Sequence, residues 1–171
     1  MTTQSYSLPP TAHIGHVHLR VADLDRSIAF YRDALGFTLR VDGRTIGIPV
    51  AFLAAGDYHH HIALNTFESA GGTTPASKHT GIYHLAIVYP DRASLIRAVE
   101  QVLACGGTID GGRDHGATVS VYLRDPDRTG IELYYDRPLS AWVDANGTFI
   151  VKNDPFDVAA LLSERNDAAA A

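Results

Sequence analysis

The sequence contains almost no cysteine and no long apolar run. Cys105 is the single cysteine among the 171 residues, so an internal disulfide and a thiolate zinc cluster are both excluded. No stretch has the length of a membrane-spanning helix, and the first residues carry neither the basic nor the apolar region of a signal peptide, so we expect a cytoplasmic protein. The 14 Lys and Arg residues are outnumbered by 19 Asp and Glu residues, and the net charge of −5 offers no basic surface to nucleic acid.

A repeated segment occupies much of the chain. It begins at His16 with HVHLRVADLDRSIAFYRDALGF and again at His84 with HLAIVYPDRASLIRAVEQVLACGG. In each copy, a strand-like run is followed by an aspartate and then by apolar residues at helical spacing. The copies match, at one constant spacing, in four pairs: His16 and His84, Asp23 and Asp91, Ile28 and Ile96, Leu35 and Leu103. A histidine at the same place in both copies suggests two half-sites that face one another.

The length and the apolar fraction of 46% suit one soluble globular domain. The predicted parts are an arm at 1–12, module one at 13–67, a breaker-rich linker at 68–81, module two at 82–138, and an extension at 139–171 with a disordered end. Each module should run strand, helix and three strands. The expected strands are 13–20, 37–41, 45–53, 58–66, 82–88, a short one near 108, 117–123 and 129–135, with helices from Asp23 and Asp91 and a turn at Asp42-Gly43.

Three residues have the chemistry of a metal site. Two neutral imidazoles and one carboxylate form a ligand set that suits Fe(II) and leaves coordination positions open for other molecules. His16 and His84 supply the imidazoles, and Glu132 lies in an alternating strand whose other face is apolar, so its side chain should face a cleft. His18 shares a strand face with His16 and stays an alternative ligand.

These segments resemble the vicinal oxygen chelate superfamily, which unites glyoxalases, bleomycin-resistance proteins and extradiol dioxygenases. GHVHLRVADLDRSIAFYRDALGF is similar to the superfamily's opening strand and helix, and GIYHLAIVYPDR to its second metal-binding strand. DHGATVSVYLRDPDRTGIELYYDRP is similar to the closing module of the short two-module catechol 2,3-dioxygenases. The resemblance covers residues 13–138 and implies an α+β fold, in which paired βαβββ modules form a curved mixed sheet around a metal-binding cleft.

The resemblance also implies a role for each motif residue. His16, His84 and Glu132 become the ligands of Fe(II), with Mn(II) as an alternative. Tyr122, which lies ten residues before the carboxylate, becomes a phenol that contacts the substrate. His115 of the DHG motif contacts the substrate or oxygen.

The His59-His60-His61 run allows more than one interpretation. YHHHIALN resembles the family strand H-x-x-A-L, whose histidine is the acid/base residue, and this selects His60. Simple strand alternation instead turns His59 and His61 toward the cleft, and a bulge would reconcile the two. We predict His60 as the acid/base residue and keep His61 as the alternative. A third possibility is that His61 replaces the additional ligand that metal-dependent isomerases of the superfamily place on this strand.

The predicted function is that of an extradiol dioxygenase, which inserts O2 into a catechol-type diol, in a homo-oligomer that is most simply a dimer. The turn DPDRTG, with Arg128, and the run ATVSV after His115 depart from the family pattern, so the resemblance defines the chemistry better than the substrate. A glyoxalase-like isomerase or lyase is one alternative, but it normally needs a fourth ligand, usually Glu, opposite Glu132, and the matching strand of this chain offers three histidines and no acid. A metal-free binding protein of the resistance type is another alternative. Such a protein needs no ligand triad, so the presence of all three candidate ligands argues against it.

Overall fold

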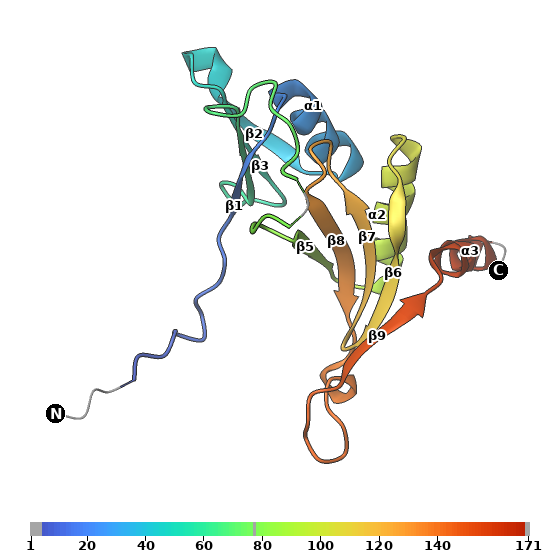
Figure 1. Ribbon diagram of the computed structural model, residues 1–171. Helices are drawn as coiled ribbons and strands as arrows, with labels where there is room; N and C mark the ends of the chain where they lie inside the picture. The colour runs from blue at the N-terminus through green and yellow to red at the C-terminus, as the bar shows by residue number, and fades with distance from the viewer. Residues whose placement is uncertain (1–4, 77, 170–171) are drawn as a thin grey trace.

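The computed structural model describes residues 5–76 and 78–169, and its strands form two mixed sheets (Figure 1). Sheet A consists of β1 (Val17–Arg20), β4 (Ile62–Asn65), β3 (Val50–Ala54) and β2 (Thr38–Asp42), in that order. Sheet B consists of β5 (His84–Tyr89), β8 (Gly130–Asp136), β7 (Thr118–Arg124), β6 (Ile109–Gly116) and β9 (Val151–Phe156). In each sheet the first two strands are parallel and the other pairs antiparallel. The α+β class and the paired βαβββ modules are therefore confirmed.

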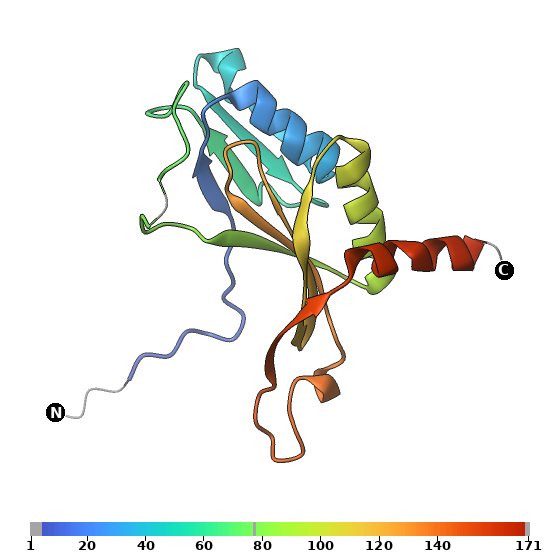
Figure 2. The same cartoon turned by 45° about the vertical axis from the view of Figure 1, so that its right-hand side comes forward.

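Each module carries one helical segment between its first two strands (Figure 2). Module one has α1 (Leu24–Ala29), which continues as the π-helical turn η1 (Phe30–Ala34), and module two has α2 (Arg92–Ala104). The helices start where the sequence predicts, and both aspartates are N-caps: Asp23 accepts a hydrogen bond from the Arg26 backbone at 2.9 Å and Asp91 from the Ser94 backbone at 2.7 Å. None of the helices within residues 5–76 and 78–169 has both the length and the apolar character to cross a membrane.

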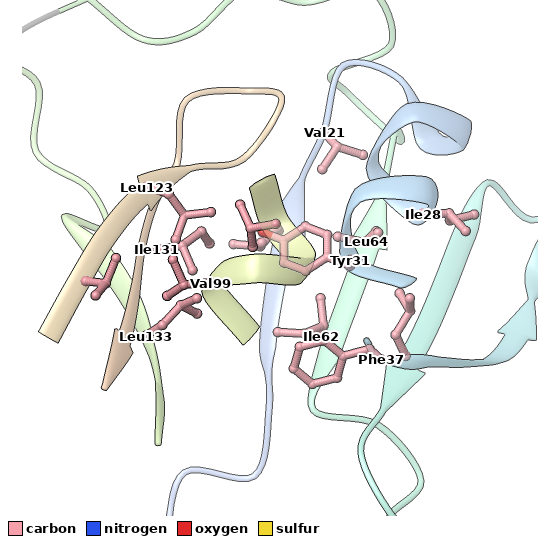
Figure 3. Close-up of a cluster of buried hydrophobic side chains, with 14 of the residues drawn as sticks. Val21, Ile28, Tyr31, Phe37, Ile62, Leu64, Val99, Leu123, Ile131 and Leu133 are labelled. Carbon is pink, nitrogen blue, oxygen red and sulfur yellow. The ribbon is translucent and has the colours of Figure 1, made fainter. Parts of the chain in front are cut away.

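One hydrophobic core joins the two modules, with the side chain of Tyr31 between them (Figure 3). Tyr31 belongs to η1 and is fully buried, and η1 contacts α2 of the other module. Its hydroxyl donates to Oδ2 of Asp125 at 3.1 Å, and Oδ1 of Asp125 accepts from the backbones of Asp127 and Thr129. Burial raises the pKa of Tyr31 and that of the Asp125 carboxyl. This buried pair therefore holds the β7–β8 turn of module two against module one.

We expect Tyr31→Phe to lower the free energy of unfolding by about 1–3 kcal/mol, because the ring stays while a buried carboxyl loses its side-chain donor. Urea unfolding should show a lower midpoint with an unchanged slope. Tyr6→Phe is the matched control, because Tyr6 is 85% exposed and its hydroxyl faces water. A Tyr31→Phe protein as stable as the wild type would show that the bond to Asp125 contributes nothing to the joint between the modules.

The C-terminal extension adds a strand and a helix to module two. The sequence does not predict β9, because VKNDPF lacks alternation and contains Pro155, which a sheet tolerates here only because the strand lies at the edge. The helix α3 (Val158–Ala169) follows and contacts α2, with Leu161 fully buried. The expected disordered end is instead helical as far as Ala169, which agrees with the high helix propensity of alanine. Residues 170–171 lie outside the described residues.

The predicted Asp42-Gly43 hairpin turn is wrong. The chain forms a 3-10 helix, η2 (Gly43–Ile46), because the Asp42 carboxylate accepts a hydrogen bond from the Arg44 backbone at 3.1 Å and so caps it. As a result β3 begins at Val50, five residues later than expected.

Arg128, the departure noted in the DPDRTG turn, adopts a left-handed backbone conformation with φ of 70°. This conformation costs an L-residue about 1–2 kcal/mol, whereas glycine adopts it freely but loses more chain entropy on folding. We therefore expect Arg128→Gly to raise the free energy of unfolding by about 0.5–1 kcal/mol. Arg97→Gly, at an exposed position in α2, is the matched control and should lower it by about 1 kcal/mol. Destabilisation by both substitutions would contradict the interpretation of strain at Arg128.

Candidate functional site

Each sheet has one face toward the shared core and one open face. Along β8, Ile131 and Leu133 are fully buried in the core, so Glu132 between them points to the opposite face. Along β1, Leu19 is buried while His18 is exposed. Glu132 and His18 therefore lie on the open faces, as the alternation of their strands requires.

Glu132 is the centre of a hydrogen-bonded group on the open face of sheet B. Its Oε2 lies 2.9 Å from Nε2 of His84, and its Oε1 accepts a hydrogen bond from the Tyr122 hydroxyl at 2.8 Å. Tyr122 is directly opposite Glu132 in the pairing of β7 with β8, and Nε2 of His115 lies 2.7 Å from the same hydroxyl. We call these four residues the sheet B half-site. They bring together four of the six predicted site residues.

The spacing of His84 and Glu132 suits two neighbouring ligands of one metal ion. Two donors at about 2.1 Å from an ion and at right angles lie about 3.0 Å apart, close to the separation of their facing atoms. The other ring nitrogen of His84, Nδ1, is buried and has no hydrogen-bond partner. An unpaired nitrogen lone pair costs less than an unpaired N–H, which favours the proton on Nε2, where it donates to Glu132. A cation bound here would displace that proton, as metal binding to histidine requires.

The hydrogen bonds that connect His115 with the Lys152 carbonyl, with Tyr122 and on to Glu132 need three protons. A neutral His115 and the Tyr122 hydroxyl supply only two. Nδ1 of His115 must donate to the Lys152 backbone carbonyl, 3.0 Å away, because a carbonyl only accepts. If the Tyr122 hydroxyl donates to Glu132, Nε2 of His115 must also donate, and the ring is then an imidazolium. If His115 is neutral, Tyr122 must turn its proton to His115 and leave Glu132. Burial, followed by the hydrogen bond to Glu132, raises the pKa of Tyr122 to about 12, so its proton stays on the phenol.

A cavity of 490 Å³ opens beside the sheet B half-site. His84, His115 and Tyr122 form part of its wall, together with Arg113 and Asn153. Sequence reasoning missed the last two residues, although alternation along β6 places Arg113 on the same face as His115. No sequence signal indicates Asn153, because it belongs to the unexpected β9. The cavity has the size of a small-molecule site.

A second histidine group lies on the open face of sheet A. The rings of His16 and His60 are 4.5 Å apart between centroids, and the His60 ring stacks on Phe52 at 4.6 Å. We call these three residues the sheet A half-site. Nδ1 of His59 lies 2.7 Å from Nδ1 of His60, so one proton joins the two rings. Desolvation, and then the charges of the surrounding histidines, lower the pKa of His60.

The structure gives His60 and His61 different surroundings. Strand β4 begins only at Ile62, so the expected bulge is replaced by an irregular bend that contains both histidines. Nδ1 of His61 accepts a hydrogen bond from the Ala55 backbone at 3.3 Å, and its ring lies against Tyr58. His60 is instead directed at His16. This placement agrees with the motif register, and the acid/base role itself stays a prediction.

The two half-sites do not meet within one chain. Among the side chains described, those of residues 5–76 and 78–164, no group of three or more His, Cys, Asp and Glu is placed to hold a metal ion, so His16 is out of reach of an ion at His84 and Glu132. The alternative ligand His18 instead pairs with the Asn65 side chain at 2.9 Å. The donor types fit a divalent metal, but one chain presents them as two separate parts.

Residues 13–133 match the model of the Glyoxalase/Bleomycin resistance protein/Dioxygenase superfamily. The chain belongs to this superfamily. It is 36% identical over 163 residues to a catechol-2,3-dioxygenase of Bacillus subtilis (strain 168), a match that covers 94% of this chain and 55% of the relative. The chain therefore spans about half the length of that relative.

Other superfamily members resemble the chain along most of their own length. A lactoylglutathione lyase of Haemophilus influenzae is 34% identical over 126 residues, which are 69% of this chain and 88% of the relative. A glyoxalase/dioxygenase from Nostoc punctiforme superposes with a TM-score of 0.62 at 26% identity, covering 80% of this chain and all of that structure. Dioxygenases and lyases are thus both among its relatives, so the comparisons show the superfamily without choosing the reaction.

The strand register identifies the residue of module one that is equivalent to Glu132 in this superfamily fold. In sheet B, Ala86 pairs with Glu132, two residues after His84. In sheet A, His18 pairs with Ala63, two residues after His16. A superfamily site with a carboxylate in both modules would need an acid at Ala63, and the methyl group there cannot bind a metal.

Proposed function

We propose that this protein is a metal-dependent extradiol dioxygenase, which opens the ring of a catechol-type diol with O2 and works most simply with Fe(II). The observation that carries the proposal is the series His115–Tyr122–Glu132, linked by contacts of 2.7 and 2.8 Å along a small-molecule cavity. It places two potential hydrogen-bond donors beside the carboxylate of the proposed metal site. Groups so placed stabilise charge that develops on a substrate oxygen. The identity with the Bacillus catechol-2,3-dioxygenase supports the same reaction class.

His84 and Glu132 would hold the ion together with a His16 side chain, which the second copy in the expected dimer would supply because one chain keeps its own His16 apart, and Glu132 would be the only anionic protein ligand. When bound, Fe(II) would lower the pKa of the diol and mediate electron transfer from the diol, which is oxidised, to O2, which is reduced. The remaining steps belong to the side chains around the cavity.

Tyr122 and His115 would hold protons for the substrate oxygens. If Glu132 binds a cation, its carboxylate becomes a weaker acceptor for the Tyr122 hydroxyl, which can then donate its hydrogen bond into the cavity. Nε2 of His115 adjoins that hydroxyl and can replace its proton. On the sheet A side, His60 would take a proton from a diol hydroxyl and later return it, the role of a general acid/base. Its contact with His16 places it next to a predicted ligand.

A lactoylglutathione lyase activity is the second candidate, because several relatives with that name are 28–34% identical. The resemblance implies that glyoxalase-like isomerases and lyases of the superfamily need an additional carboxylate in module one. Ala63 occupies the equivalent position, so we expect no such activity.

Anaerobic loading with Fe(II), followed by oxygen and a panel of catechols, tests the proposed function. We expect a yellow ring-opened product from at least one catechol and none from protein loaded with Zn(II). The same Zn(II) and Ni(II) preparations should be assayed with the hemithioacetal of methylglyoxal and glutathione. Turnover of that substrate without turnover of any catechol would replace the proposal by the lyase assignment.

A further inference from the structure

The cavity beside the sheet B half-site extends past the proposed site residues to the edge of the sheet. The strands run in the order β8, β7, β6 and β9 (Figure 1). Glu132 and Tyr122 lie on the first two of these strands, and Arg113 and Asn153 lie on the other two. With about 4.8 Å between neighbouring strands, the backbone of β6 is about 10 Å from that of β8. A molecule bound beside Glu132 can therefore extend toward Arg113 and Asn153.

The middle of the cavity has room for a substrate ring. Gly111 of β6 is paired with Tyr122 of β7, so no side chain covers the phenol from that position. A Cβ added at Gly111 would meet no other atom within 4 Å, which shows that the space there is open. Arg113 follows Gly111 by two residues and therefore lies on the same face of β6. A ring that occupies the open space has the guanidinium of Arg113 on its far side.

Arg113 presents a positive charge that other described side chains do not neutralise. Its Nη1 donates to the preceding backbone carbonyl at 2.9 Å, and no Asp or Glu among those side chains forms an ion pair with it. The acid next to it in the sequence, Asp114, pairs with Arg137 at 2.7 Å. Arg124, which also lines the cavity, pairs with Asp110 at 2.8 Å. The remaining N–H groups of Arg113 are therefore available to a bound anion.

The charge of Arg113 acts on the interior of the cavity. Burial and the hydrogen bond to Glu132 raise the pKa of Tyr122 to about 12, and the charge of Arg113 opposes this rise. The guanidinium therefore lies close enough to the phenol to act on it electrostatically. A substrate that contacts Tyr122 is within the same field.

Asn153 adds a hydrogen-bond donor beside Arg113. Arg113 is paired with Pro155 of β9, and Asn153 precedes Pro155 by two residues, so Arg113 and Asn153 are diagonal neighbours on one face. Diagonal neighbours are about 7–8 Å apart, within reach of long side chains. Asn153 lines the cavity, and its side chain has no hydrogen bond to another described residue. Its amide can therefore donate to the same ligand as Arg113.

We propose that Arg113 and Asn153 form an anion subsite, which binds a carboxylate on the substituent of the ring diol. The planar guanidinium offers two parallel N–H groups that match the two oxygens of a carboxylate, and the amide of Asn153 donates a further hydrogen bond. A neutral substituent of the same shape gains no charge attraction. The inference rests on the dioxygenase function proposed above and adds to it that the preferred substrate is a catechol with an anionic side chain.

Pairs of acids and amides of equal size test the anion subsite. The probes are catechols that carry a carboxylate on the ring directly, after one methylene group or after two, each compared with its primary amide. Isothermal titration calorimetry measures their binding to metal-free protein, and kcat/KM is measured with iron-loaded protein. The best acid should bind at least about 10-fold more tightly than its amide, the usual effect of charge-assisted hydrogen bonds, and kcat/KM should favour the acid by a similar factor.

Substitutions in the subsite should change the preference for the acid and leave the binding of the amide nearly unchanged. Arg113→Gln should lower the preference about 10–100-fold. Arg113→Lys, which keeps the charge but loses the planar fork, should restore part of it. Asn153→Asp places a like charge beside the ligand at almost the same size and should weaken binding of the acid at least about 10-fold. Arg97→Gln, at an exposed arginine of α2, is the matched control for the loss of one positive charge and should not alter the preference.

The outcomes separate this inference from the proposed function. Equal binding of acid and amide by the wild type, or an unchanged preference in the Arg113→Gln protein, overturns the anion subsite. The dioxygenase proposal survives either result if the iron-loaded protein opens neutral catechols. A preference for the acid that depends on Arg113, together with no opening of any catechol after iron loading, supports the anion subsite and overturns the proposed function.

Discussion

The Glu132→Ala protein should retain iron at least about 100-fold less tightly than the wild type. Loss of a group that only orients a metal ligand already costs about 10–100-fold in affinity, and Glu132 is the single anionic member of the proposed ligand set. The ratio of iron to protein after gel filtration, measured by mass spectrometry, gives the result. Turnover of a catechol should fall in parallel and recover in part when excess Fe(II) is added.

Glu164→Ala is the matched control for this prediction. Glu164 is also a carboxylate with a basic partner, Arg92, but the pair lies between α2 and α3. Its loss should leave the iron content unchanged. If the Glu132→Ala protein retains as much iron as the wild type, Glu132 is not a metal ligand, and its carboxylate acts only as a hydrogen-bond acceptor for Tyr122.

Replacement of His60 by alanine should lower turnover by about 10²–10⁴-fold, the usual effect of losing a general acid/base. Iron content should stay close to that of the wild type, because His60 is proposed to move protons and not to hold the metal. Single-turnover kinetics of the iron-loaded variant with its best catechol provide the measurement.

His61→Ala separates the two interpretations of the histidine run. The His61 ring bonds to the Ala55 backbone, so this variant should lose some stability while its turnover, corrected for folded protein, changes little. His79→Ala is the matched control at an exposed histidine. If His61→Ala is inactive while His60→Ala resembles the wild type, strand alternation predicts the acid/base residue correctly and the motif register is wrong.

The features that the sequence predicts well are those that short-range chemistry controls. The helix starts at Asp23 and Asp91 and the repeated βαβββ order follow from local spacing, whereas Tyr122 is selected as a site residue by the superfamily resemblance. These signals lie within a few residues, and tertiary contacts reinforce them. The members of the sheet B half-site all come from module two, and the resemblance selects Tyr122 and His115 among them.

The features that the sequence does not predict depend on long-range competition. The Asp42 carboxylate forms a cap where a hairpin turn is expected, and β9 gains its stability from the edge of β6 instead of from its own pattern. The separation of His16 from His84 has the same origin. The repeat in the sequence indicates two half-sites. Whether they face each other within one chain depends on the buried contacts around Tyr31, which fix the arrangement of the two modules.

Turnover in ¹⁸O2 tests the central claim most directly. Iron-loaded protein should consume one O2 for each catechol, and mass spectrometry should find ¹⁸O in the carboxylate of a ring-opened product. The Glu132→Ala protein, prepared in the same way, should form no labelled product. Oxygen consumption that yields only an unlabelled quinone, or no consumption with any catechol while the iron stays bound, would contradict the assignment as an extradiol dioxygenase.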